Sequence, residues 1–308
     1  MERKDLITSM SESTDDYIWH EVDGDTRKWF RPSDVTVGTD GAIYIADWYD
    51  PVVGGHRMMD SIGYGRIYRV TPKGKSLKVP KIDLTTMDGQ IAALLNPAVN
   101  VRNLGFEALL KQKGKAVLPV AAVLKDPNPY HRARAIWLLS QLNNRGENLV
   151  ENILIKEPNP RLRITAYRAL KGDKKSLMKY AAIAVDDPSP AVRREVAISL
   201  RDADWEEIEG LVKELFNGYD GKDRWYVEAL GLAVEGKEEQ AYASLLADQN
   251  PNPAQWSENF ASFVWRIHPK SAIAALKERA LSDEVSDSLK RSSIDAIAFI
   301  SETEAVEA

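Results

Sequence analysis

The fold of this chain can be predicted from one segment, Asp187-Pro-Ser-Pro-Ala-Val-Arg-Arg-Glu-Val-Ala-Ile-Ser-Leu200. Proline has no backbone N–H and disfavours helix in the residue before it, so Pro188 ends one helix. Pro190 suits the first turn of the next helix, and Ser189 before it can act as the capping residue. The apolar residues that follow recur at helical spacing. The segment therefore predicts two helices joined by a proline turn.

The same unit recurs along the chain, with the proline turn repeated at 126–129, 157–160 and 250–253. Five arginines align at spacings of 30 or 31 residues: Arg102, Arg132, Arg163, Arg193 and Arg224. In four copies a leucine follows seven positions after the arginine, whereas in the fifth Leu230 follows after six. Because one helix pair cannot bury both of its faces, such pairs must stack. The sequence thus predicts a helical solenoid over residues 83–300, followed by a frayed tail at 301–308.

The aligned arginines are predicted to be structural. An arginine at the same place in every repeat can form a ladder of charge-assisted hydrogen bonds to an acid or carbonyl of the neighbouring turn. The alternative is that the arginines bind phosphate or carboxylate ligands. The aromatic residues at apolar helix positions are expected in the core; they are Trp137, Tyr167, Trp225, Tyr226, Trp256 and Trp265.

Residues 1–82 have the pattern of a small antiparallel β segment. Short runs rich in β-branched and aromatic residues at 34–37, 42–46 and 66–70 predict three strands. The pair Asp40-Gly41 between the first two favours a tight hairpin turn. The connection from 47 to 65 is long and carries aromatic, charged and glycine residues, which predicts an ordered binding loop.

Composition excludes several kinds of site. The chain has 308 residues and no cysteine, which rules out disulfides, thiolate metal sites and a cysteine nucleophile. Its four histidines are widely spread, so a histidine metal site is not expected. No apolar run approaches the roughly 18 residues that a membrane helix needs, and the first residues lack the apolar core of a signal peptide.

Charge is distributed unevenly along the chain. Residues 101–200 hold 18 lysines and arginines against 9 aspartates and glutamates, whereas residues 201–308 hold 11 against 22. The net charges are therefore +9 and −11. Such an asymmetry can steer a charged partner or let two copies associate, although it can also reflect an unevenly charged solvated surface.

The repeats, with Asp-Pro before the turn and Val-Arg at the start of the second helix, closely resemble HEAT repeats. The segment Trp29-Phe-Arg-Pro-Ser-Asp-Val-Thr-Val-Gly-Thr-Asp-Gly-Ala-Ile-Tyr-Ile-Ala-Asp-Trp-Tyr-Asp-Pro51, with Gly65-Arg-Ile-Tyr-Arg-Val70, resembles the end of a β-propeller. It is similar to the glucose/sorbosone dehydrogenase-like propellers of large bacterial membrane-bound dehydrogenase-like proteins, in which HEAT repeats follow the propeller. The expected fold class is therefore mainly α, a HEAT-like α-solenoid preceded by the last blade of a truncated propeller.

The resemblance implies where a cofactor of the whole protein would bind. The family's reaction would be oxidation of a sugar or polyol with pyrroloquinoline quinone and calcium, and no cofactor is expected in this fragment. Arg31, Asp34 and Asp47 are the candidate cofactor-binding residues, because a guanidinium suits a quinone carboxylate and carboxylates suit calcium. His56 and Asp50 are the candidate catalytic residues. Each of the five could instead make only local hydrogen bonds.

Three functions remain open on the sequence. The first is the C-terminal scaffold of a periplasmic or secreted dehydrogenase-like protein, inert alone, with the missing propeller blades or a protein as partner. The second is a separate HEAT-repeat module whose basic stretch, including Lys113, Lys115, Arg132 and Arg134, binds an acidic protein. The third, nucleic-acid binding, is disfavoured by the pI near 5.6 and the acidic last third.

Overall fold

The computed structural model describes residues 6–7, 30–48 and 65–307. The chain divides into two compact units, residues 1–119 and 120–308, and each unit is described by itself. Over the described ranges, no helix is long and apolar enough to cross a membrane.

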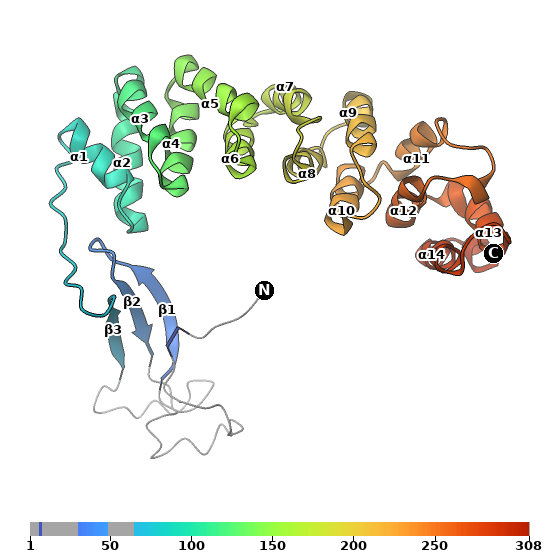
Figure 1. Ribbon diagram of the computed structural model, residues 1–308, viewed down its shortest axis with the longest axis horizontal. Helices are drawn as coiled ribbons and strands as arrows, with labels where there is room; N and C mark the ends of the chain where they lie inside the picture. Colours follow the sequence, from blue (N-terminus) through green and yellow to red (C-terminus); the bar gives the residue numbers. More distant parts are fainter. Residues whose placement is uncertain (1–5, 8–29, 49–64, 308) are drawn as a thin grey trace, which may run out of the picture. The chain divides into compact units, whose positions relative to one another are not determined.

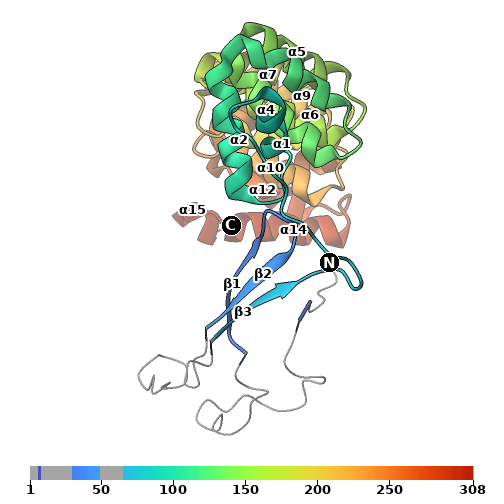
Figure 2. The same cartoon turned by 90° about the vertical axis from the view of Figure 1, so that its left-hand side faces the viewer.

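The first unit contains a three-stranded antiparallel sheet in the order β1-β2-β3 (Figure 2). Its strands are β1 (Pro32–Val37), β2 (Ile43–Asp47) and β3 (Arg66–Val70). The predicted hairpin joins β1 to β2: Gly41 has a φ of +84°, and the Gly38 N–H donates to the Ala42 carbonyl at 2.8 Å. The sequence prediction of a small antiparallel β segment is therefore confirmed.

Two helices, α1 (Met87–Leu94) and α2 (Val99–Gln112), complete this unit. Thr86 caps α1, because its hydroxyl accepts the Gly89 N–H at 3.1 Å. The loop between the helices contacts the hairpin, where the Asn96 side-chain amide donates to the Thr39 carbonyl at 3.3 Å. A 3₁₀ turn, η2 (Lys113–Ala116), then leads into α3 (Val117–Ala122), which contains the division between the units.

The second unit consists of paired helices. A 3₁₀ turn, η3 (Val123–Lys125), precedes them. The helices are α4 (Pro129–Leu142), α5 (Asn144–Lys156), α6 (Pro160–Leu170), α7 (Lys174–Ala184), α8 (Pro190–Ser199), α9 (Trp205–Asn217), α10 (Arg224–Ala233), α11 (Glu238–Leu246), α12 (Glu258–Ile267), α13 (Ile273–Leu281), α14 (Asp287–Ala298) and α15 (Thr303–Glu307). Short 3₁₀ turns η4 (Pro253–Gln255) and η5 (Lys270–Ala272) precede α12 and α13.

Proline turns set the helix starts as the sequence predicted. Pro129, Pro160 and Pro190 are the first residues of α4, α6 and α8. Before the first two, Asn128 and Asn159 accept the N–H of the second helical residue at 3.0 Å. The paired-helix repeat is therefore confirmed in this part of the chain.

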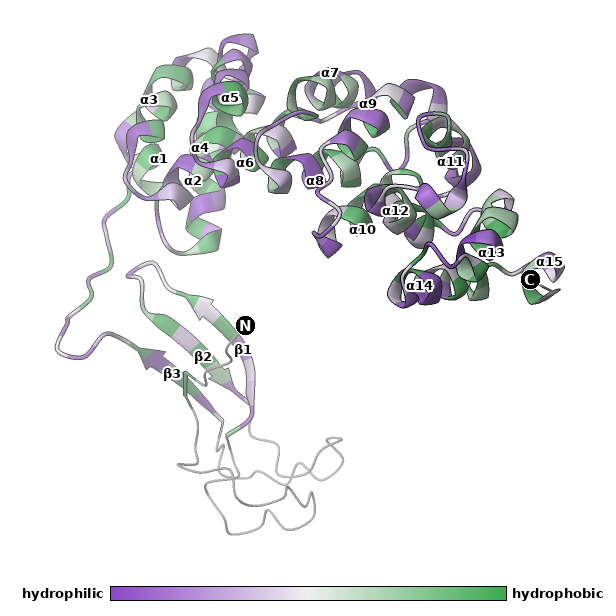
Figure 3. Ribbon diagram, turned by 45° about the vertical axis from the view of Figure 1, so that its right-hand side comes forward, coloured by the Kyte–Doolittle hydropathy of each residue, from purple (hydrophilic) through white to green (hydrophobic). Residues whose placement is uncertain are grey.

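The helices from α4 to α14 form two rows, one even-numbered and one odd-numbered (Figure 1). Each even-numbered helix packs on the next, α4 on α6, α6 on α8 and so on to α14. Successive odd-numbered helices contact one another much less than successive even-numbered helices do. The array therefore curves towards the even-numbered row. The helices carry both hydrophobic and hydrophilic residues (Figure 3), as stacked pairs with one solvated face require.

The predicted core positions of the aromatic residues are only partly observed. Tyr167, Tyr226 and Trp256 are buried as expected. The prediction is wrong for Trp137 and Trp225, whose side chains are 41% and 74% exposed. Helical spacing identified the correct secondary structure for both tryptophans but not the face on which they lie.

Candidate functional site

The first residue of each helix shows which of the aligned arginines occupy equivalent positions in the repeat. Arg102, Arg132, Arg163 and Arg193 are each the fourth residue of an even-numbered helix, α2, α4, α6 and α8. Arg224 is instead the first residue of α10, whose fourth residue is Val227. Arg224 follows Arg193 by 31 residues, but it does not occupy the equivalent position of its repeat.

Three of these arginines contact the turn before the next even-numbered helix. Arg132 forms an ion pair with Glu157. Arg163 donates from Nε and Nη2 to the two carboxylate oxygens of Asp187, both at 2.7 Å, and this pair is buried. Arg193 donates to the Gly218 carbonyl at 2.8 Å. These contacts hold each repeat to the next one.

The other two arginines lie in different surroundings. Arg102 is half-buried on α2 in the first unit. Arg224 is exposed and bonds within its own helix, to Glu228 at 2.6 Å. Its guanidinium also lies 4.6 Å from the centre of the Trp265 ring. Arg224 thus belongs to a different site from the ladder, the pocket described below.

The candidate cofactor residues of the β segment make local contacts. The Arg31 N–H donates to the Asp47 carboxylate at 2.7 Å, and the Val35 N–H donates to the Asp34 carboxylate at 2.7 Å. The Arg31 guanidinium donates to the Phe30 carbonyl at 3.1 Å. The candidate catalytic residues, Asp50 and His56, lie outside the described residues.

The described residues do not form a cofactor site by themselves. Over these ranges, no three histidine, aspartate or glutamate residues come together in a way that could hold a metal ion. Asp34 and Asp47 each accept one backbone N–H through a single carboxylate oxygen. Calcium takes about six to eight oxygen ligands, so these two carboxylates would be only part of the calcium site that the resemblance implies for the whole protein.

An exposed aromatic and basic surface lies on neighbouring even-numbered helices. We call it the α4–α6 face; it consists of Tyr130, the half-buried Arg134 and Trp137 on α4, and of Arg161 and Arg168 on α6. Arg168 forms an ion pair with Glu195. Tyr130 and Trp137 are 72% and 41% exposed. The three α4 residues follow one another at intervals of four and three, so they share one side of the helix. The proline turns place Tyr130 and Arg161 at the same position of successive repeats.

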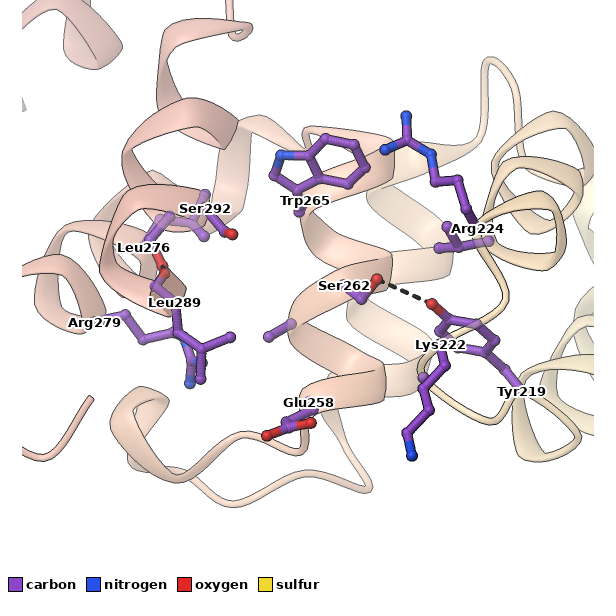
Figure 4. Close-up of a pocket in the computed structure, with 14 residues that line it drawn as sticks. Tyr219, Lys222, Arg224, Glu258, Ser262, Trp265, Leu276, Arg279, Leu289 and Ser292 are labelled. Carbon is purple, nitrogen blue, oxygen red and sulfur yellow. Dashed lines mark hydrogen bonds between the residues drawn. The ribbon is translucent and has the colours of Figure 1, made fainter. Parts of the chain in front are cut away.

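A pocket of about 340 Å³ lies between α10, α12, α13 and α14. Figure 4 shows Glu258, Ser262 and Trp265 on α12, with Leu276, Arg279, Leu289 and Ser292 on the side of α13 and α14. Tyr219, Lys222 and Arg224 line the other side, from the turn before α10 and the start of that helix (Figure 4). The Tyr219 and Ser262 hydroxyls are hydrogen-bonded at 3.1 Å.

The pocket coincides with an interruption of the arginine ladder. The fourth residues of α10 and α12 are Val227 and Ala261, and both line the pocket. Small apolar side chains stand there where earlier repeats have a long arginine. This site was not predicted from the sequence. Its available signal was Leu230, which follows Arg224 by six positions instead of seven and so marks the shift of register in this repeat.

Burial changes the proton affinity of two groups in the pocket. It lowers the pKa of Arg279, because the charged guanidinium loses contact with water. It raises the pKa of Tyr219, because the phenolate would be poorly solvated there. An arginine stays protonated in proteins, and a phenol with a raised pKa stays neutral at neutral pH, so the pocket presents a buried cation and a neutral phenol.

Comparison with known families supports the helical repeats. Residues 117–201, from α3 to just beyond α8, match a family model described as HEAT repeats. Residues 7–74 match a domain of unknown function (DUF7133), which spans the three strands. No curated protein matches the chain. The HEAT-like interpretation of the sequence is thus confirmed, while the dehydrogenase propeller remains a proposal.

Proposed function

We propose that the helical array is a protein-interaction scaffold whose α4–α6 face binds an acidic segment of another protein. The observation that carries this proposal is the exposure of Tyr130 and Trp137 among arginines on one side of neighbouring helices. HEAT-like arrays expose one long face of stacked helices, which suits an extended partner. The HEAT match covers these two helices.

The chemistry of the face indicates the kind of partner. Tryptophan, tyrosine and arginine are the residues that contribute most often to binding energy at protein interfaces. Tyr130 and Trp137 expose apolar surface to water, and a partner would bury it. Residues 101–200 carry a net charge of +9, so the field around them attracts acidic segments and repels basic ones.

Selection of peptides on the full chain tests this proposal. A displayed library of random 12-residue peptides should enrich acidic sequences that contain an aromatic or aliphatic residue. Trp137→Ala combined with Arg161→Glu should weaken the selected peptides at least tenfold in calorimetry, because it removes apolar contact and reverses a charge. Their affinity should also fall as salt rises, because screening weakens the charge attraction.

A matched control lies on the other row of helices. Ile155 on α5 is also an exposed apolar residue, at 54%, so Ile155→Ala should leave peptide binding unchanged. The proposal fails if the enriched peptides are neutral or basic. It also fails if the double variant binds them as tightly as the original chain.

We further propose that the β segment belongs to a larger β domain of a periplasmic or secreted, quinone-dependent dehydrogenase-like protein, with the array as its scaffold. The supporting observation is the exposure of both outer strands over nearly their whole length. Val35 on β1 and Ile67 on β3 are 62% and 77% exposed, and further strands would bury them. A sheet of three strands gains stability from such a neighbour.

Cofactor titration tests this second proposal. Pyrroloquinoline quinone added with calcium to the whole protein that carries this chain should give a saturable heat of binding. The same titration into residues 1–308 should give none, because this proposal places the rest of the cofactor site in the larger β domain. Absence of binding to the whole protein would refute the proposal.

A further inference from the structure

Arg279 is an unusual residue in the lining of the pocket. Its side chain is almost completely buried, at 2% exposure, and its Nη1 donates to the Pro253 carbonyl at 2.5 Å. Its Nε is buried and has no hydrogen-bond partner among the described residues. The guanidinium also lies 5.7 Å from the centre of the Trp256 ring, which gives partial compensation. No ion pair of Arg279 exists within the described ranges.

A buried arginine normally has an acidic partner, because the removal of a charge from water is costly unless a counter-charge offsets it. Arg163 in the ladder shows the usual solution, with two bonds to the Asp187 carboxylate. Arg279 has no such carboxylate partner among the described residues, and it lines a cavity of about 340 Å³. An anion in the cavity would supply the missing counter-charge.

The rest of the lining favours the same kind of ligand. Lys222 adds a second cation, and it is exposed with no ion pair among the described residues. Glu258 is the one carboxylate among the described lining residues, and its side chain is solvent-exposed. If Tyr219 donates to Ser262, the Ser262 proton is free to donate to a ligand oxygen.

Apart from Ser292 and Ser293, much of the remaining wall is apolar. Trp265, Val227 and Leu289 line the pocket together with Ala261. The Trp265 ring is covered on one face by the Arg224 guanidinium, which keeps the ring in place. A ligand that suits this lining has a compact apolar body beside its anionic group.

We propose that this pocket binds the carboxylate of an amphiphilic organic acid, with the carboxylate directed towards Arg279 and the apolar body against Trp265 and Val227. The ligand can be a free acid or the carboxyl terminus of a polypeptide, since both present the same chemistry. The proposal does not depend on the α4–α6 face, because the pocket lies at the other end of the second unit.

Titration of the full chain with 3-phenylpropionate tests the site. Calorimetry should show binding with one molecule per chain. The neutral amide, 3-phenylpropionamide, should bind at least tenfold more weakly, because it has the same shape but no charge to pair with Arg279. Equal binding of acid and amide, or of neither, would overturn the proposal.

Variants place the ligand in the pocket. Arg279→Met removes the buried charge at similar size and should reduce binding of the acid to the level of the amide. Ala261→Leu should fill the cavity and abolish binding of both the acid and the amide. This second variant tests the site even if the Arg279 variant folds poorly. Lys222→Met should weaken binding about threefold. Lys213→Met, on α9 away from the pocket, should have no effect.

The two sources of carboxylate are distinguished by a second titration. A peptide that ends in phenylalanine with a free carboxyl group is compared with the same peptide ending in an amide. Tighter binding of the free peptide than of 3-phenylpropionate assigns the site to a polypeptide terminus. Binding of the small acid alone assigns it to a free organic acid. Failure of both acids refutes the site and leaves the proposal for the α4–α6 face unaffected.

Discussion

Replacement of Arg163 by methionine should lower the free energy of unfolding of the second unit by about 3–5 kcal/mol. The Arg163 guanidinium makes two bonds of 2.7 Å to Asp187 and a third of 2.7 Å to the Glu157 carbonyl, and both charged side chains are buried. Methionine would leave the Asp187 carboxylate buried without its counter-charge. The buried carboxylate left without a partner, rather than the lost attraction of the pair, produces the large effect.

Urea denaturation followed by circular dichroism measures this change, and Arg168→Met is its control. Arg168 also forms two bonds to one carboxylate, that of Glu195, but its side chain is 53% exposed. The Glu195 side chain is only 11% exposed, but its partner Arg168 faces solvent, so water can take the place of the guanidinium and the control should cost about 1 kcal/mol. Equal effects of the two substitutions would contradict the structural role assigned to burial of the ladder.

Amide hydrogen exchange extends this test to the mechanism. The Arg163 contact joins the start of α6 to the turn before α8, so its loss should reduce protection first in these two helices. Protection in α12 should change little, because each repeat of such an array contacts only its neighbours. A uniform loss of protection along the second unit would show that the array unfolds as one cooperative body.

The helical repeat was predictable because its signals are local. Proline turns fix where α4, α6 and α8 begin, and asparagine caps add to the first two, so these signals act within a few residues. At α8 the proline acts without a cap, because the Ser189 side chain makes no capping hydrogen bond. The position of Arg224 was not predictable from spacing alone. Its helix begins after Asp223, which caps α10 without a proline, so an interval of 31 residues led to a different position of the repeat.

The pocket and the exposed tryptophans depend on packing between helices that are distant in the sequence. Trp137 and Tyr167 both occur at helical spacing among apolar residues, yet one is 41% exposed and the other is fully buried. Periodicity shows which residues share a side of one helix, but not how much of that side a neighbour covers. The buried Arg279 gave no local signal either, because its burial results from contacts with the turn at Pro253.

Replacement of Gly146 by alanine should destabilise the second unit by about 3 kcal/mol, at the upper end of the usual cost of overpacking. Gly146 lies in the first turn of α5, where the helix crosses closely over α4. A Cβ atom at this position would stand 2.2 Å from the Leu139 carbonyl oxygen. That oxygen belongs to the backbone of α4, so the clash cannot be relieved by rotation of a side chain.

Gly210 in α9 provides the opposite result with the same substitution. A Cβ atom there has no heavy atom within 4 Å, so Gly210→Ala adds no clash. It should raise stability by about 0.5–1 kcal/mol, because alanine restricts the unfolded chain and favours helix. Thermal and urea denaturation of both variants measure the difference. The same substitution favours helix at Gly210 and adds a backbone clash at Gly146, so opposite signs would report the close contact of α4 with α5. Equal signs would show that this contact relaxes on substitution.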